Sequence, residues 1–299
     1  MKGTKIMELV EMKSSVKRVN TFLDLPFRTQ KPRKNGLTIL IDNGISTQHF
    51  FDVVDSCREL IDIVKFGWCT CLVTKDIDKK IQYLLSKRVE FYFGGTLFEK
   101  AFQQGKLDSL YEYFKQCGCI YVEISNGTVA LSNREKAKYI SDFSKDFNVF
   151  SEVGYKDPQK SQDLAPEEWI EYIHEDIEAG ALKVITEARE SGRSGICSAD
   201  GSIRYGLIQE ILKSGVNLED LVFEAPNKAL QVYFIKQLGA NVNLANIAFD
   251  DVIGLETLRL GLRSDTLNLF EGVLEPIRKI NAGDRACQQL QHLQNSKPG

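Results

Sequence analysis

The stretch KVITEARESG, residues 183–192, begins like a buried β-strand and ends in charge. Val184 and Ile185 are apolar and β-branched, as a strand interior prefers, and the sequence EARE (187–190) follows at once. Strands usually end in Gly, Asn or Ser, because these residues ease the backbone through a turn. Two carboxylates around a guanidinium do not help a turn, so this strand end indicates a functional site.

Seven other short apolar runs resemble this one, and most of them also end in polar or charged residues. They cover residues 37–42, 61–68, 89–95, 120–125, 148–156, 221–226 and 242–247. The starts of the eight runs lie 21 to 38 residues apart. That spacing leaves room for a strand, a helix and two loops in every repeat.

The segments between the runs have helical signals. In residues 49–61 the apolar positions form one stripe of a helix. The sequence from Ser132 to Glu135 is a capping box, and Pro166 and Gly180 suit the first turn and the end of another helix. Apolar strands that alternate with amphipathic helices predict a parallel sheet covered by helices.

Eight such units predict an α/β protein of one domain, a (β/α)8 TIM barrel, whose usual length is about 250 residues. The competing fold is a doubly wound open sheet, which normally has a glycine-rich turn after its first strand. The sequence IDNGIS (41–46) is not of the G-x-G-x-x-G type. We expect the barrel to cover residues 21–270, with an N-terminal extension (1–20) and a C-terminal tail (271–299).

The composition excludes several classes of function. The net charge of -3 and the pI near 5.8 argue against a broad basic face, so we expect no nucleic-acid and no membrane-surface partner. No apolar run approaches the roughly 20 residues that span a bilayer, and residues 1–15 have acidic residues where a signal peptide has its apolar core. Together with seven cysteines that lack zinc-type spacing, this predicts a cytoplasmic protein with reduced thiols.

The ends of the predicted strands gather charge. In a barrel these ends meet at one mouth, which is where active sites form. Six strands supply a charged residue there, the third strand supplies Gly94 and Gly95, and the eighth supplies Asn243 and Asn246; the charged residues are Asp42, Lys65, Glu123, Glu152, Glu187 and Glu224. Each buried charge costs several kcal/mol unless it is paired or binds a metal. The pattern predicts an enzyme with an acidic floor suited to Mg²⁺, which prefers carboxylate oxygens.

Strings of sequence along most of the chain resemble the phosphosulfolactate synthase family. They are LIDNG (40–44), VKFGW (64–68), FYFGGTLFEK (91–100), EISNG (123–127), SEVGYK (151–156), ITEARESG (185–192), VFEAPNK (222–228), VNLANIAFD (242–250) and LETLRLGLRSDT (255–266). The resemblance implies a (β/α)8 barrel and a Mg²⁺-dependent lyase that adds sulfite to phosphoenolpyruvate. The product would be (2R)-phospho-3-sulfolactate, formed through an ene-diolate, for coenzyme M or sulfolactate biosynthesis.

The resemblance also implies roles for residues. Lys156 is the expected general acid, although a salt bridge to Glu152 or Asp157 would be a purely structural role for it. Glu187 and Arg189 complete the expected catalytic set. The expected substrate-binding residues are Lys65, Gly95, Ser191, Gly192 and Asn246, and the expected metal ligands are Asp42, Glu123, Glu152 and Glu224. The expected partners are the two small substrates, in a homo-oligomer.

One departure and two rival hypotheses remain. Cys69 stands where the family has glycine, and a positive φ angle there would strain the loop by about 1–2 kcal/mol. The first rival is a barrel of this family that acts on another phosphorylated enol or a 2-oxo acid. The second is a non-catalytic, stress-related interaction protein, since plant relatives of the family are associated with heat-stress tolerance. That rival predicts an eroded mouth, whereas the charged residues of the mouth are all present here.

Overall fold

The computed structural model describes residues 23–270, so the predicted N-terminal extension (1–20) and C-terminal tail (271–299) lie outside the described residues. Each of the eight predicted strands is present inside the apolar run that predicts it. The strands are β1 (Thr38–Asp42), β2 (Ile63–Phe66), β3 (Glu90–Phe93), β4 (Tyr121–Ile124), β5 (Asn148–Val153), β6 (Lys183–Thr186), β7 (Leu221–Glu224) and β8 (Leu244–Ile247).

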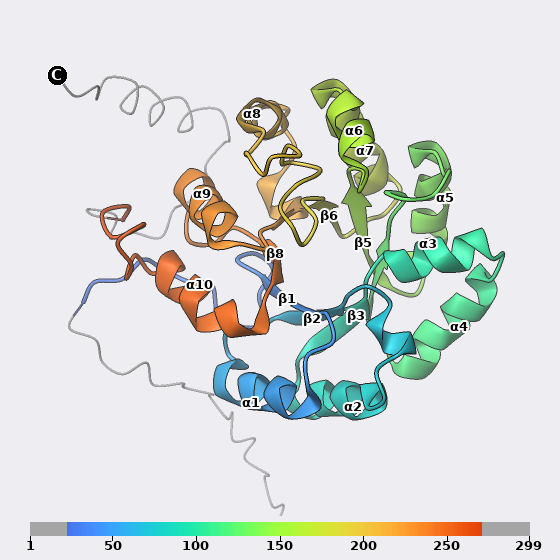
Figure 1. Cartoon of the computed structure of the whole chain (residues 1–299), viewed down its shortest axis with the longest axis horizontal. Coiled ribbons are helices and arrows are strands. Elements are labelled where there is room, and N and C mark those ends of the chain that lie inside the picture. The colour runs from blue at the N-terminus through green and yellow to red at the C-terminus, as the bar shows by residue number, and fades with distance from the viewer. Residues whose placement is uncertain (1–22, 271–299) are drawn as a thin grey trace, which may run out of the picture.

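The strands form one parallel sheet that curls into a barrel. Their hydrogen-bonded order is β3-β2-β1-β8-β7-β6-β5-β4, and β3 lies beside β4, so the sheet nearly closes on itself. Helices alternate with the strands and surround them (Figure 1). The chain is therefore a single-domain (β/α)8 TIM barrel of the α/β class, as its spacing predicts.

The surrounding helices include the three for which the sequence gives signals. The helices are α1 (Thr47–Cys57), α2 (Ile77–Lys87), α3 (Thr96–Gln103), α4 (Leu107–Cys117), α5 (Asn133–Phe143), α6 (Pro158–Asp163), α7 (Pro166–Glu178), α8 (Tyr205–Lys213), α9 (Lys228–Leu238) and α10 (Val252–Arg259). The capping box of Ser132 and Glu135 opens α5, and Pro166 opens α7. Helix α1 ends four residues before the predicted limit of residue 61.

The interior of the barrel is a small apolar cluster separate from the core between sheet and helices. Its members are Leu37, Ile39, Ile63, Tyr92, Phe150, Ile185, Val222 and Ala245. Side chains two positions apart on a strand share a face. Lys65, Glu152, Glu187 and Glu224 each follow an interior residue by two positions, so the strands direct them into the barrel above this apolar layer.

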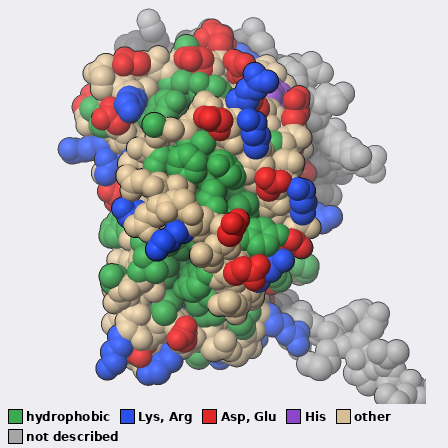
Figure 2. Space-filling model, turned by 90° about the vertical axis from the view of Figure 1, so that its right-hand side faces the viewer, with side chains coloured by type: hydrophobic (Ala, Val, Ile, Leu, Met, Phe, Trp, Pro, Cys, Tyr) green, Lys and Arg blue, Asp and Glu red, His purple; other side chains and the backbone are tan. Residues whose placement is uncertain are grey.

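One face of the molecule illustrates the charge balance. Over α3, α4 and α5, Lys and Arg side chains alternate with Asp and Glu side chains among apolar strips (Figure 2). This face shows no broad basic patch.

Candidate active site

A cavity of about 510 Å³ opens at the C-terminal ends of the strands. Its polar lining consists of Lys65, Thr96, Glu123, Thr128, Glu152, Lys156, Glu187, Arg189, Glu190, Glu224 and Asn246. Residues from seven separate strand ends thus meet at the mouth where barrel enzymes place their active sites. The five carboxylates outnumber the three cations, which leaves the cavity with a formal charge of -2.

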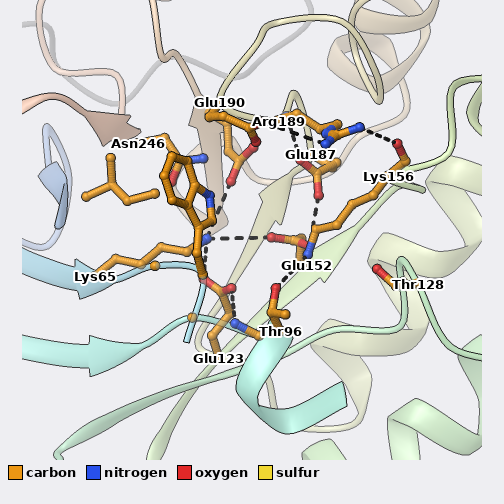
Figure 3. A pocket seen from close by; sticks show the side chains of 16 residues that line it. Lys65, Thr96, Glu123, Thr128, Glu152, Lys156, Glu187, Arg189, Glu190 and Asn246 are labelled. Carbon is orange, nitrogen blue, oxygen red and sulfur yellow. Dashed lines mark hydrogen bonds and ion pairs between the residues drawn. The ribbon is translucent and has the colours of Figure 1, made fainter. Parts of the chain in front are cut away.

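Lys65 occupies the floor of this cavity (Figure 3). Its Nζ lies 3.0 Å from Glu123 Oε2, 3.5 Å from Glu224 Oε1 and 3.7 Å from Glu152 Oε2. Burial lowers the pKa of Lys65, but the charges of Glu123 and Glu224 outweigh it and raise the pKa well above its usual value. Lys65 is therefore a permanent cation held from three sides.

Lys156 approaches the same carboxylates from the opposite side (Figure 3). Its Nζ is 3.3 Å from Glu152 Oε1 and 3.9 Å from Glu187 Oε2, and it donates a 3.4 Å hydrogen bond to Thr96 Oγ1. Burial lowers the pKa of Lys156, but the neighbouring glutamates raise it above its usual value. The salt bridge between Lys156 and Glu152 is therefore present. It holds the ammonium group inside the cavity, so it is compatible with a catalytic role for Lys156.

The carboxylates near the two lysines differ in the direction of their pKa shifts. Burial raises the pKa of Glu152, but Lys156 and Lys65 flank it and lower the pKa to about 2, so Glu152 is ionised. Burial raises the pKa of Glu187 well above its usual value, and the charges of Glu152 and Glu224 raise it further. Burial also raises the pKa of Glu123. The cavity floor therefore contains acidic groups that a bound cation would help to ionise.

Arg189 lies at the rim, where the strand has already ended. Its φ angle is +58°, and its backbone N–H donates a 2.5 Å hydrogen bond to Glu187 Oε1. The guanidinium donates to Lys156 O at 3.3 Å and is 3.6 Å from Glu190 Oε1. Glu187 thus orients Arg189 through the backbone and leaves the guanidinium, which is 39% exposed, facing the solvent side of the cavity.

Backbone strain concentrates around this cavity. Trp68, Arg189 and Asn246 line it with φ angles of +52°, +58° and +58°. Cys69, at +55°, follows Trp68, so the position where the resemblance implies glycine does have a positive φ angle. Non-glycine residues in this region cost free energy and cluster at functional sites. The strain expected from Cys69 is therefore present in the loop after β2.

Gly94 and Gly95 allow close packing and not a sharp turn. Neither has a positive φ angle, and a Cβ at Gly94 would lie 2.9 Å from Lys65 Cε. A Cβ at Gly95 would overlap the side chain of Ser125, and the Gly95 N–H donates a 2.5 Å hydrogen bond to Glu123 Oε1. These glycines therefore keep space for the two charged side chains of the floor.

Asp42 lies apart from the other candidate metal ligands. Its neighbour Ile41 faces the cavity, so Asp42 points outward to the helices. There Lys80 Nζ of α2 is 2.6 Å from Asp42 Oδ2, and the backbone N–H groups of Gly44 and Ile45 donate to Oδ1. Asp42 points away from the cavity because an odd step along a strand reverses the direction of a side chain. Its buried ion pair with Lys80 and its hydrogen bonds to the backbone fix the loop after β1.

The expected substrate-binding residues of the loop after β6 and of β8 are not all at the cavity. Asn246 lines the cavity, whereas Ser191 and Gly192 do not. The Gly192 N–H donates to Arg189 O at 3.2 Å, so it serves the turn of the loop. The cavity thus unites nine of the twelve candidates named from sequence: Lys65, Gly95, Glu123, Glu152, Lys156, Glu187, Arg189, Glu224 and Asn246.

The structure adds residues that the strand-end pattern does not reveal. Trp68, Thr96, Thr128 and Glu190 line the cavity, and the buried Glu99 lies 4.0 Å from Lys156 Nζ and accepts a hydrogen bond from Ser125. Glu99 is buried on α3, directly after the buried Leu97 and Phe98. The sequence around Glu99 contains no local signal for this role.

The carboxylates suit a cation that needs further ligands. Glu187 Oε2 and Glu99 Oε2 are buried and accept no hydrogen bond within residues 23–270. In the same described part of the chain, no three His, Cys, Asp or Glu side chains converge to hold a metal ion by themselves. Mg²⁺ usually takes one or two protein carboxylates and completes its shell with water and substrate oxygens. The donor set therefore fits Mg²⁺ together with an oxygen-rich substrate.

Comparisons with known proteins agree on one family. A family model described as (2R)-phospho-3-sulfolactate synthase (ComA) matches residues 26–265. A phosphosulfolactate synthase of Bacillus subtilis (strain 168) is 55% identical over 83% of this chain and 98% of its own. That of Methanocaldococcus jannaschii is 42% identical over 78% of this chain and 94% of its own. The protein HEAT-STRESS-ASSOCIATED 32 of Arabidopsis thaliana is 23% identical over 81% and 92%.

A separate finding concerns membranes. Between residues 23 and 270, no helix is both long enough and apolar enough to cross a bilayer.

Proposed function

The chain belongs to the phosphosulfolactate synthase family, and we propose that it adds sulfite to phosphoenolpyruvate in the cavity at the barrel mouth. The observation that carries the proposal is a pair of lysines, the buried Lys65 and the partly buried Lys156, which share Glu152 between them. Two fixed cations over an acidic floor suit a substrate whose carboxylate gains charge during the reaction.

The reaction needs a group that protonates carbon. The sulfur lone pair of sulfite forms the new bond to the methylene carbon of phosphoenolpyruvate, and the π electrons move toward the carboxylate as an ene-diolate. The central carbon then takes a proton, which Lys156 supplies. Its raised pKa keeps Lys156 protonated until a strongly basic carbon forms beside it.

Other residues of the cavity bind or stabilise the negatively charged groups of the substrate. Lys65 stabilises the ene-diolate, since a lysine in a closed site stabilises such an intermediate more strongly than water does. Arg189 binds the phosphate or the carboxylate at the rim, because it is the one cation of the lining without a carboxylate within 3.5 Å among the described residues. Asn246 faces the same space from β8.

Mg²⁺ would supply Lewis-acid neutralisation of the substrate carboxylate and phosphate when bound. Glu187 and Glu224 are the side chains best placed to hold it, because Glu187 has a buried oxygen without a hydrogen-bond donor and Glu224 is among its nearest charges. Glu123 and Glu152 balance Lys65. The expectations of a cytoplasmic location and a homo-oligomer stay predictions.

The similarity to the plant protein suggests a second hypothesis, a non-catalytic role in protein interaction. The interaction-protein hypothesis predicts an eroded mouth, but this mouth keeps both lysines and their carboxylates within 4 Å of one another. A different nucleophile on the same enol is the remaining rival within the family. Both rivals are distinguished by the assay that follows.

The test is an assay of the purified protein with phosphoenolpyruvate, sulfite and Mg²⁺, followed by loss of the enol absorbance. We expect turnover that stops when any one of the three is omitted. Turnover without sulfite would indicate another nucleophile, and absence of both turnover and phosphoenolpyruvate binding would contradict an enzymatic role on this substrate.

A further inference from the structure

A second groove adjoins the main cavity and shares two of its wall residues. The groove has a volume of about 400 Å³ and lies between α3 and the loop after β4. Thr96 and Thr128 line both hollows, so their side chains mark the junction between them. Among the described residues, Lys100 is the one cation and Glu99 the one carboxylate that line the groove.

Both threonine hydroxyls are available to donate a hydrogen bond. Thr96 Oγ1 accepts from Lys156 Nζ at 3.4 Å, which leaves its own hydrogen free for another acceptor. The side chain of Thr128 is exposed and makes no hydrogen bond within residues 23–270. A small anion at the junction would thus meet two neutral donors and lie next to the Lys156 ammonium.

The charge of the main cavity explains why a second anion needs such a place. The floor is acidic, and its two lysines are already surrounded by glutamates. Phosphoenolpyruvate would take up what positive charge remains. A second anion is repelled from that floor, whereas the groove, lined by Lys100 and Glu99, has no formal net charge and repels it less.

We propose that sulfite binds at this junction between Thr96 and Thr128, and reaches the methylene carbon of phosphoenolpyruvate from there. The proposal rests on the proposed function and adds to it the group that selects the nucleophile. The sulfur lone pair forms the carbon–sulfur bond, the displaced π pair enters the substrate carboxylate, and the Lys156 proton then goes to the central carbon. No oxidant or reductant is needed.

The test uses the variants Thr96→Val and Thr128→Val, which remove a hydroxyl and keep the shape of the side chain. Each variant should raise KM for sulfite about tenfold, since a hydrogen bond to a charged group is lost, while KM for phosphoenolpyruvate stays within twofold. Thr257→Val on α10, outside both hollows, is the matched control and should change neither KM. Calorimetric titration of each protein with sodium sulfite should show the same loss of affinity.

The outcomes separate this inference from the proposed reaction. Turnover in the unmodified protein with unchanged sulfite KM in both variants would overturn the junction site and leave the reaction standing. Sulfite binding that depends on the threonines, without turnover, would support the junction and overturn the reaction. Equal increases in both KM values would show that the threonines position phosphoenolpyruvate, and neither binding nor turnover would overturn both proposals.

Discussion

At the scale of single residues, the alternation of side chains along a strand decides what enters the cavity. Glu187 and Glu224 each follow an interior apolar residue by two positions and face the site. Asp42 follows Ile41 by one position and pairs with Lys80 on the outside of the sheet. A charged residue at a strand end can therefore be assigned to the site only if its side chain points into the barrel.

Lys156→Ala tests the role of the general acid. We expect kcat to fall about a thousandfold, because proton donation by a positioned group contributes 10²- to 10⁴-fold, with a smaller change in KM for phosphoenolpyruvate. Steady-state kinetics measures both values. Lys160→Ala, an exposed lysine of α6 outside the cavity, is the control and should keep full activity. Equal losses in the two variants would contradict a specific role for Lys156.

At the scale of elements, sequence signals predict the strands and helices more completely than they predict the loops. β-Branched runs and caps act locally, so all eight strands and the capping box of α5 could be predicted. Glu99, Thr96 and Thr128 reach the site through the packing of α3 against β4. That packing is a long-range contact, and one sequence without its fold does not contain a local signal for it.

The residue that ends α2 has a strained backbone conformation, and its replacement should stabilise the protein. Arg88 caps this helix with a φ angle of +57°, is exposed, and has no ion pair within residues 23–270. Glycine adopts this conformation without a steric penalty. We expect Arg88→Gly to raise the free energy of unfolding by about 1 kcal/mol, as measured by urea denaturation. Arg88→Ala keeps the strained backbone, so an equal gain from it would contradict the explanation.

A buried ion pair joins helices α5 and α7 to the strand that carries Glu152. Lys136 Nζ is 2.7 Å from Asp176 Oδ2 and donates to Glu152 O at 2.9 Å, and both side chains are fully buried. Breaking such a pair leaves an uncompensated charge, so Lys136→Met should lower the free energy of unfolding by about 3–5 kcal/mol. Urea denaturation measures the change.

The exposed Lys138 on the same helix is the matched control for this ion pair. Lys138→Met should change the free energy of unfolding by less than about 0.5 kcal/mol, as surface substitutions usually do. Similar losses from the two substitutions would show that the contribution comes from the helix and not from the buried pair.

At the scale of the whole molecule, the barrel has one weak seam. Seven neighbouring strand pairs are hydrogen-bonded in the described residues, whereas β3 and β4 lie side by side without a strand ladder between them. The Gly95 N–H after β3 reaches Glu123 Oε1 on β4 and bridges this seam with a side chain. Glu123, which lines the cavity, therefore also joins β3 to β4.

Hydrogen exchange tests the seam. The backbone N–H groups of β3 and β4 that face each other have no strand partner, so no ladder has to break before they exchange. We expect peptides that cover residues 90–93 and 121–124 to exchange faster than those that cover β1 and β8, as measured by mass spectrometry. Uniform protection around the barrel would contradict the presence of a seam.

Proton NMR of the reaction in D₂O shows directly whether a bond between sulfur and carbon forms. Lysine protons exchange with solvent, so we expect the enol methylene signals to disappear while a sulfonate-bearing methylene appears next to a central carbon that carries deuterium. Methylene signals that persist, or a product such as pyruvate that contains no carbon–sulfur bond, would contradict the addition of sulfite to phosphoenolpyruvate.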